Sequence, residues 1–205
     1  MNNAGCAVFR EIHRGPVGIV CGKGNNGGDG FVVARLALLA GLRPQVVLVG
    51  EPSSLTADAR VFFEIYKRLG GKLRIVGTES EATTAVSNLK SCPTLVDALL
   101  GTGIEGEVRG IARAVIEAWP YPRRWGTEPR CVAVDVPSGL NADTGEPCGC
   151  SIRADVTVTF QCKKRGFDNP AARRFLGKLV IADIGIPDIC FDDGRWTALK
   201  RTISE

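Results

Sequence analysis

The sequence has few features of nucleic-acid or membrane binding, and their scarcity excludes two classes of partner. No run of basic residues is longer than Lys163–Arg165, and the net charge is only +4, which argues against a nucleic-acid binder. The longest apolar stretch, residues 31–40, contains Arg35 and is too short to span a bilayer. The only histidine, His13, lies outside every candidate loop below and is interpreted as a surface or core residue. We therefore expect neither nucleic acid nor membrane as a partner.

The cysteines lack a metal-binding spacing, although the chain has eight of them. No pair has the two-residue gap of a zinc knuckle, and Cys148 and Cys150 are too close together for one. Cys21 and Cys131 fall in or beside apolar strand-like runs, where a free thiol behaves as a small hydrophobic side chain. Free thiols imply a reducing compartment, and the N-terminus lacks the pattern of a secretory signal. A cytoplasmic location is expected.

What the sequence does contain is an alternation of short apolar runs and longer helical patterns over 205 residues. Alternation of this kind is typical of a parallel sheet with helices on both faces. The expected strands are 17–21, 45–49, 73–76, 94–96, 131–134, 156–160 and 178–181, and the expected helices are 31–40, 56–69, 79–89 and 111–118. We predict an α/β fold: a three-layer αβα sandwich, Rossmann-like, with a mostly parallel central sheet in a single domain spanning residues 1–205.

Three loops rich in glycine or polar residues follow expected strands directly. They are residues 22–30 after the first strand, 97–103 after the fourth and 135–139 after the fifth. Ligand sites in sheets of this type lie at the carboxyl ends of the strands, near a switch in strand order. The three loops are therefore expected to meet at one edge of the sheet.

The first loop has the glycine spacing of a dinucleotide-binding fingerprint, at Gly22, Gly24 and Gly27. Glu51, at the end of the second strand, stands where a ribose-binding acid is expected. A nicotinamide-dependent dehydrogenase is thus the first hypothesis. A tight structural turn is the alternative for this segment.

The polar residues of the same loop argue against a dehydrogenase. Asp29 lies at the expected helix start, where a carboxylate can cap the helix but would repel a bound phosphate. Asn25 and Asn26 present side-chain amides, which suit hydroxyls, carboxamides or a cation.

The other two loops add oxygen ligands. Asp97 ends an apolar strand, where it could cap a helix or bind a cation. Asn26, Asp97 and Ser138 would together supply only oxygen, which suits a hard cation and not zinc or copper. Asp135 would remain free to act as an acid, a base or a hydroxyl acceptor.

At this point the residues resemble a known family, the YjeF N-terminal domain family, whose enzymes are NAD(P)H-hydrate epimerases. The resemblance rests on residues 24–30, 96–103 and 135–139, and it continues through 154–160, Lys164 and 183–187. It implies that the protein interconverts the R and S forms of hydrated NADH or NADPH, so that a separate dehydratase can restore the cofactor. It also implies a homodimer.

The resemblance further implies roles for individual residues. One potassium ion per subunit would be bound by Asn26, Asp97 and Ser138. Proton transfer would fall to Asp135, assisted by Lys164 through phosphate binding or charge stabilisation; a solvated surface lysine is the alternative for Lys164. The hydrate would be held by Asn25, Asn26, Gly27, Gly28, Asp29, Gly101, Thr102, Gly103, Ile104, Glu105, Gly106, Glu107 and Asp135.

The chain departs from the family pattern at two places. It begins inside the usual Met-Glu-Asn-Ala-Gly stretch, as Met1–Gly5, so the family's N-terminal helix is expected to be truncated. The loop 120–129 also looks longer than usual. Two rivals stay open: a non-catalytic scaffold of the same family, and a dehydrogenase, for which the sequence offers no clear proton donor beyond Asp135 or Lys164.

Overall fold

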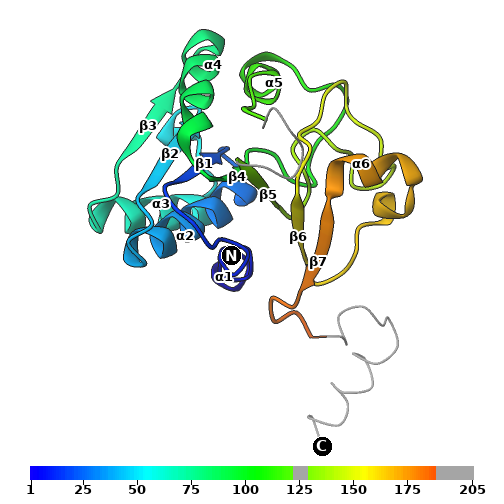
Figure 1. The fold of residues 1–205 in the computed structure, drawn as a ribbon, viewed down its shortest axis with the longest axis horizontal. Coiled ribbons are helices and arrows are strands. Elements are labelled where there is room, and N and C mark those ends of the chain that lie inside the picture. The colour runs from blue at the N-terminus through cyan, green and yellow to red at the C-terminus, as the bar shows by residue number, and fades with distance from the viewer. Residues whose placement is uncertain (122–128, 188–205) are drawn as a thin grey trace, which may run out of the picture.

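The computed structural model describes residues 1–121 and 129–187, which form one seven-stranded sheet covered by helices (Figure 1). The strands are β1 (Val17–Cys21), β2 (Pro44–Val49), β3 (Leu73–Val76), β4 (Thr94–Ala98), β5 (Arg130–Val134), β6 (Val156–Phe160) and β7 (Lys178–Ala182). Their order is β3-β2-β1-β4-β5-β6-β7, and every neighbouring pair is parallel. The predicted α/β class and each predicted strand are confirmed.

Helices cover both faces of the sheet, as expected for a three-layer sandwich (Figure 1). Their bounds are α1 (Asn2–Phe9), α2 (Asn25–Leu39), α3 (Ala57–Arg68), α4 (Glu79–Ser87), α5 (Gly110–Glu117) and α6 (Arg173–Leu176). One core joins α1, α2 and α3 to one set of strand side chains, including Ile19 and Val96. A second core joins α4 and α5 to the alternate set, including Val20 and Leu95. Successive strand residues therefore point into different cores, as the period-2 geometry of a strand requires.

The strand order changes direction between β1 and β4. From β1 the chain moves outward to β2 and β3, then returns to β4 on the other side of β1. The loops after these two strands diverge to opposite faces, which opens a crevice at their carboxyl ends.

The glycine-rich segment differs from the prediction. Residues 25–30 are not a loop but the first turns of α2, which begins at Asn25 rather than at residue 31. The glycines let this helix approach the sheet: a Cβ on Gly27 would lie 1.9 Å from the carbonyl oxygen of Gly22, and one on Gly30 would lie 2.6 Å from Cβ of Ala98. Asp29 lies in the second turn, too far along for the predicted capping role.

The N-terminal residues form a helix that the sequence patterns did not reveal. Helix α1 packs against α2, and Gly5 permits the contact, since a Cβ there would lie 2.4 Å from Cβ of Val32. Between β6 and β7 the chain forms two 3-10 turns and α6, which were also not predicted.

Several exclusions drawn from the sequence can be compared with the structure. The seven cysteines within the described ranges are all free, and Cys190 lies outside those ranges. No helix in the described ranges is long and apolar enough to cross a membrane. His13 is exposed, as expected for a surface residue. Most of the loop 120–129 falls at residues 122–128, outside the described residues.

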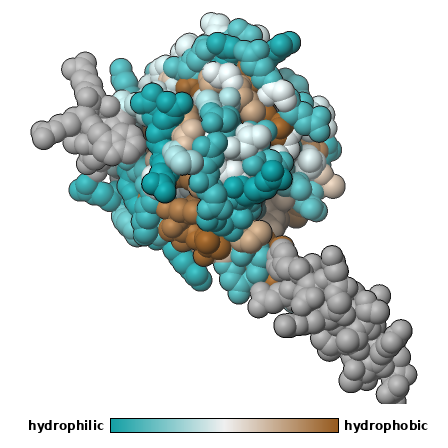
Figure 2. All heavy atoms as spheres, turned by 90° about the vertical axis from the view of Figure 1, so that its right-hand side faces the viewer, coloured by the Kyte–Doolittle hydropathy of each residue, from teal (hydrophilic) through white to brown (hydrophobic). Residues whose placement is uncertain are grey.

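The edge of the sheet at β7 faces the viewer in Figure 2. Hydrophilic residues cover most of that face, and hydrophobic residues gather in one area near its lower border. β7 ends the strand order, and its Ile181 is 53% exposed.

The close approach of α2 to the sheet gives a stability prediction. Helix propensity alone would make Gly27→Ala stabilising by about 1 kcal/mol, but the methyl group would collide with the Gly22 backbone. We expect a net loss of about 1–3 kcal/mol in the free energy of unfolding in urea. Gly103→Ala is the control, because nothing lies within 4 Å of that position, and its effect should stay within about 0.5 kcal/mol. A stabilising Gly27→Ala would contradict the packing described.

Candidate functional site

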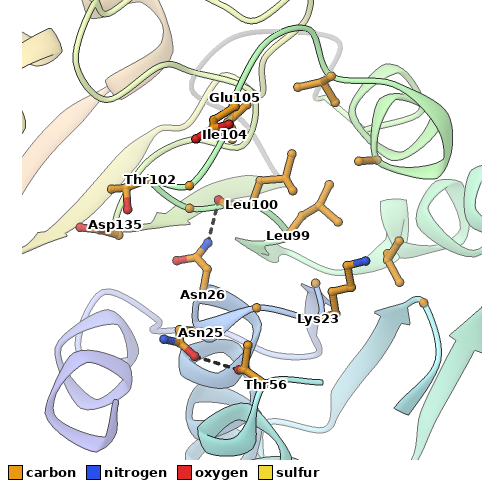
Figure 3. Close-up of a pocket in the computed structure, with 18 of the residues that line it drawn as sticks. Lys23, Asn25, Asn26, Thr56, Leu99, Leu100, Thr102, Ile104, Glu105 and Asp135 are labelled. Carbon is orange, nitrogen blue, oxygen red and sulfur yellow. Dashed lines mark hydrogen bonds between the residues drawn. The ribbon is translucent and has the colours of Figure 1, made fainter. Parts of the chain in front are cut away.

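A cleft of about 820 Å³ opens at the carboxyl edge of the sheet, at the switch between β1 and β4 (Figure 3). Its walls come from the start of α2, from the segment after β4 and from the ends of β5 and β6. The lining residues are Gly22, Lys23, Gly24, Asn25, Asn26, Asp29, Val49, Gly50, Thr56, Leu99, Leu100, Gly101, Thr102, Gly103, Ile104, Glu105, Glu107, Val108, Arg109, Ile111, Ala112, Asp135 and Phe160. The prediction that the loops meet at one edge is confirmed.

Two asparagines at the start of α2 connect the cleft walls. The Asn26 side-chain amide donates to the Leu100 carbonyl at 2.9 Å, joining α2 to the segment after β4. The Asn25 side-chain oxygen accepts a hydrogen bond from the Thr56 hydroxyl at 2.8 Å, next to the start of α3 (Figure 3). These bonds hold three segments that are distant in sequence around one opening.

Asp97 lies beneath this opening and is fully buried within β4. One carboxylate oxygen accepts from the backbone amide of Ser138 at 2.7 Å, and the other accepts from the Ser138 hydroxyl and from the Leu99 amide. The Ser138 hydroxyl oxygen in turn accepts from the Leu100 amide at 2.8 Å. Asp97 therefore joins the β4 and β5 loops instead of capping a helix, so that alternative is wrong.

The surroundings of Asp97 leave its charge uncompensated. Its hydrogen-bond donors, two backbone amides and a hydroxyl, are all neutral. Burial raises the pKa of Asp97 to about 6, although the bonds from Ser138 and Leu99 act in the opposite direction. A buried carboxylate without a cationic partner is costly. The oxygens of Asp97, Ser138 and Leu100 together form a donor set that fits a hard cation.

Asp135 follows β5 in a left-handed conformation, with φ of 62°, which is rare for residues other than glycine. One oxygen, Oδ1, accepts from the Thr159 hydroxyl and the Phe160 amide, each at 3.0 Å. Lys164 Nζ lies 2.8 Å from the same oxygen and also donates to the Phe160 carbonyl at 3.2 Å. Both charged side chains are mostly buried, at 15% and 17% exposure. Lys164 is thus not a solvated surface lysine.

Asp29 is the second aspartate of the cleft lining. The residue is only 7% exposed, and its Oδ1 atom has no hydrogen-bond partner among the residues that the structure describes. Burial raises the pKa of Asp29 to about 7; the positive Met1 amino group lowers it and the negative charge of Asp135 raises it. A buried polar atom without a partner in a ligand cleft is a feature that calls for explanation.

Not all predicted site residues line the cleft. Gly27 and Gly28 face packed atoms instead: a Cβ on Gly27 would meet the Gly22 carbonyl, and one on Gly28 would meet the Met1 side chain and the Ala59 Cα. Gly106 also lies outside the lining. Three other predicted residues lie behind the lining. Asp97 and Ser138 are bonded to each other beneath the opening, and Lys164 contacts Asp135.

Several lining residues were missed by the sequence patterns. Lys23, Thr56, Arg109 and Phe160 were not predicted as site residues, and neither were the apolar residues Val49, Leu99, Leu100, Val108, Ile111 and Ala112. The ends of β2 and β6 could have been inferred once the strand order was known, since they flank β1 and β5. Glu51, the candidate ribose-binding acid, does not line the cleft.

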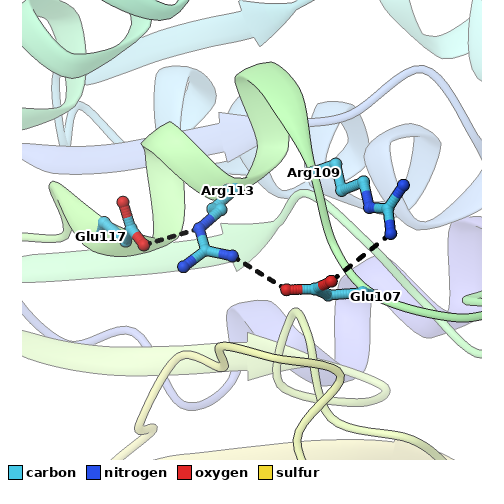
Figure 4. Close-up of polar contacts among 4 residues, drawn as sticks. All are labelled: Glu107, Arg109, Arg113 and Glu117. Atoms are coloured by element: carbon cyan, nitrogen blue, oxygen red, sulfur yellow. Dashed lines mark hydrogen bonds and ion pairs between the residues drawn. The ribbon is translucent and has the colours of Figure 1, made fainter.

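Charged side chains form a chain on the cleft rim (Figure 4). Arg113 bonds to Glu107 at 3.1 Å and to Glu117 at 2.8 Å, and Arg109 lies 3.5 Å from Glu107. Arg109 itself is 81% exposed. Glu107 is thereby oriented by α5, while the Arg109 guanidinium stays accessible at the mouth of the cleft.

A doubly wound parallel sheet with a cleft at its switch point defines a Rossmann-like α/β protein with a small-molecule site. Residues 1–166 match the family described as YjeF-related protein N-terminus. The chain therefore belongs to this family.

Individual relatives agree with this assignment. An NAD(P)H-hydrate epimerase of Rhodopirellula baltica is 38% identical, over 91% of this chain and 75% of its own length, and one of Pirellula staleyi is 39% identical, over 91% and 82%. A bifunctional NAD(P)H-hydrate repair enzyme of Moorella thermoacetica is 43% identical, but the chain spans only 36% of its length. The crystal structure of the yeast protein ynu0 shares the fold, with a TM-score of 0.67 and 22% identity over 91% of this chain and 79% of that chain.

The unpartnered Asp29 gives a pH-dependent stability prediction. Because its pKa is higher in the folded than in the unfolded chain, the wild type loses stability as pH rises from 5 to about 7. Asp29→Asn has no carboxyl group to ionise at this position and should not lose stability for this reason. The difference in the free energy of unfolding between the variant and the wild type should therefore grow in favour of the variant by up to ~3 kcal/mol across that range. Urea unfolding at pH 5 and pH 8 measures the difference. Asp58→Asn, at an exposed site on α3, should show no such growth; equal behaviour of the two variants would contradict the burial of Asp29.

Proposed function

We propose that the protein interconverts the R and S epimers of hydrated NADH or NADPH. The observation that carries the proposal is the convergence of the three motif-bearing segments on one cleft, with Asp135 among its lining residues (Figure 3). Lys164 lies against Asp135 behind that lining. The volume of about 820 Å³ lies within the usual range for small-molecule sites. Relatives that the chain covers by three quarters or more of their length bear this activity in their names.

The chemistry requires the hydroxyl group to leave the ring carbon and return on the other face. That carbon is bonded to the ring nitrogen. Once the hydroxyl is protonated, the nitrogen lone pair can expel it as water, which leaves an iminium ion. Asp135 is the acid–base group, since it is held at the cleft with one oxygen fixed by Thr159 and Phe160. Lys164 is a positioning residue that stabilises the Asp135 carboxylate at 2.8 Å.

A potassium ion is part of this proposal. Asn26, Asp97 and Ser138 would hold it, one ion per subunit, together with the Leu100 carbonyl that the Asn26 and Ser138 side chains already contact. When bound, the ion would compensate the buried charge of Asp97 and favour electron-rich oxygens of the substrate nearby. The neutral donors around Asp97 support this assignment.

Three further assignments complete the proposal. The bifunctional relatives are repair enzymes of nearly three times the matched length, which supports functional coupling to a dehydratase. A homodimer is proposed, for which the exposed Ile181 on edge strand β7 and the nearby exposed Ile186 offer apolar surface. The seven free thiols in the described ranges support a reducing, cytoplasmic location.

Neither rival is favoured by an observation of the site. A dehydrogenase would be expected to use Glu51 on the ribose, yet Glu51 lies outside the cleft lining. A scaffold has no need of an ion-paired aspartate with a left-handed backbone at the end of a cleft.

Replacement of Asp135 tests the proposed reaction. The protein is incubated with pure R-hydrate of NADH, potassium and an S-specific dehydratase, and NADH recovery is followed by absorbance. Asp135→Asn should lower the catalysed rate by about 10²–10⁴-fold, because the amide cannot transfer protons. Binding of the hydrate, measured by calorimetry, should change little because the shape is kept.

The wild type and a distant variant supply the controls. Asp143→Asn, at an exposed loop position, should match the wild type. Full activity of Asp135→Asn would refute its role. If the wild type itself binds the hydrate without speeding NADH recovery, the scaffold interpretation is favoured; hydride transfer to a carbonyl substrate would favour the dehydrogenase.

The potassium assignment predicts a salt-specific stability effect. Exchanging sodium for potassium chloride at equal ionic strength should raise the Tm of the wild type, because an ion that binds only the folded state stabilises it. Ser138→Ala removes one oxygen ligand and should reduce that rise, and Asp97→Asn should abolish it. A potassium effect that is equal in all three proteins would rule out this site.

A further inference from the structure

The cleft lining contains one buried carboxyl group to which the mechanism above gives no task. Asp29 lines the cleft, is more than nine-tenths buried, and has an oxygen without a hydrogen-bond partner. Its position follows from α2: residues four apart lie on the same side of a helix, so Asp29 stands one turn below Asn25, which also lines the cleft. Packing alone does not account for a buried carboxylate oxygen that lacks a hydrogen-bond partner in a residue of the cleft lining.

The two cleft aspartates have contrasting environments. Asp135 lies 2.8 Å from the Lys164 ammonium and accepts hydrogen bonds from the Thr159 hydroxyl and the Phe160 amide. Burial raises the pKa of Asp29 to about 7. The negative charge of Asp135 also raises it, and the positive charge of the Met1 amino group lowers it. Burial therefore favours the neutral form of Asp29, whereas Asp135 is held in an ion pair with Lys164. Contrasting environments of this kind assign acid and base roles in enzymes with paired carboxyl groups.

Two carboxyl groups on different walls suit an epimerisation. A hydroxyl that leaves one face of the ring must be protonated there, and the water that adds to the opposite face must lose a proton there. One group cannot easily reach both faces of a ring held between two walls. Asp135 comes from the end of β5 and Asp29 from α2, so the two carboxyl groups belong to different walls of the cleft.

We propose that Asp29 is the second acid–base residue of the reaction, acting on the ring face opposite to Asp135. The inference rests on the proposed epimerase function. In one direction neutral Asp29 gives its proton to the departing hydroxyl, the carbon–oxygen bond breaks with electrons supplied by the ring nitrogen, and water leaves. Water then bonds to the other face of the iminium while Asp135 takes its proton.

The step balances and exchanges the roles of the two residues. One water leaves, one water adds, and one proton passes from Asp29 to Asp135 with no oxidation or reduction. After the step Asp135 is neutral and Asp29 charged, which is the state needed to convert the opposite epimer. The enzyme would therefore run in both directions without a change of machinery, as an epimerase must.

The test compares Asp29→Asn with the wild type, using Asp58→Asn as the control. Pure S-hydrate and pure R-hydrate of NADH are incubated in ¹⁸O-labelled water with potassium, and both epimers are separated and weighed by mass spectrometry. We expect kcat for epimer exchange to fall about 10²–10⁴-fold in Asp29→Asn, with the calorimetric Kd of the hydrate within about threefold. Any ¹⁸O that Asp29→Asn still incorporates should enter without inversion at the ring carbon, because Asp135 can still act on the ring face next to it.

A second measurement follows the pH dependence of the exchange rate. The wild-type rate of exchange should fall as pH rises through about 7, where Asp29 loses its proton, and the Asp29→Asn profile should lack this alkaline decline. Exchange within tenfold of wild type in Asp29→Asn, or a parallel loss of kcat and binding, would overturn the role of Asp29. A wild type that exchanges neither epimer would instead refute the proposed function itself, so the two failures are distinguishable.

Discussion

The bond network around the buried Asp97 is the constraint on which the rest of the site depends. Asp97 can lie at the end of β4 only if its oxygens are satisfied, and the donors that satisfy it belong to Leu99 and Ser138. Ser138 then bonds the Leu100 amide, and Asn26 bonds the Leu100 carbonyl. A single buried carboxylate thereby fixes the loops after β4 and β5 against the start of α2. Without it, the three segments would share an edge of the sheet but not a common geometry.

The sheet places the segments of this network side by side, and glycines allow helix α2 to approach them closely. The strand order places β4 between β1 and β5, so the three segments that carry the chemistry are neighbours. Helix α2 must nevertheless come within backbone contact of the β1 end for Asn26 to reach Leu100. Gly27 permits that approach, since any side chain there would overlap the Gly22 carbonyl. The glycines thus serve packing, whereas their spacing had suggested a phosphate-binding loop.

Much of the fold could be predicted from the sequence because strands buried on both faces are short apolar runs. Val17–Cys21 and Val156–Phe160 were predicted to the residue, and the convergence of loops followed from parallel pairing alone. The start of α2 could not be predicted, because its first six residues contain three glycines and have poor helix propensity, which tertiary packing overrides. Helix α1 was missed in the same way, since it is short and its small residues give little periodicity.

The candidate site likewise contains residues that could be predicted from the sequence and residues that could not. Residues at strand ends, such as Asp97 and Asp135, were identifiable because a polar residue after an apolar run stands out. The pairing of Lys164 with Asp135 was not, because 29 positions separate them and only the β5–β6 register brings them together. The raised pKa of Asp29 could not be predicted from the sequence either, since it arises from burial and from the neighbouring charge of Asp135.

The measurement that tests the central claim most directly is hydrogen–deuterium exchange of the wild-type protein with and without the NADH hydrate, in potassium buffer. If one network joins the three segments into a single site, backbone exchange should slow together in residues 22–30, 99–109 and 135–139, while the β7 edge is unchanged. Protection of one segment alone, or protection confined to another part of the molecule, would contradict the account.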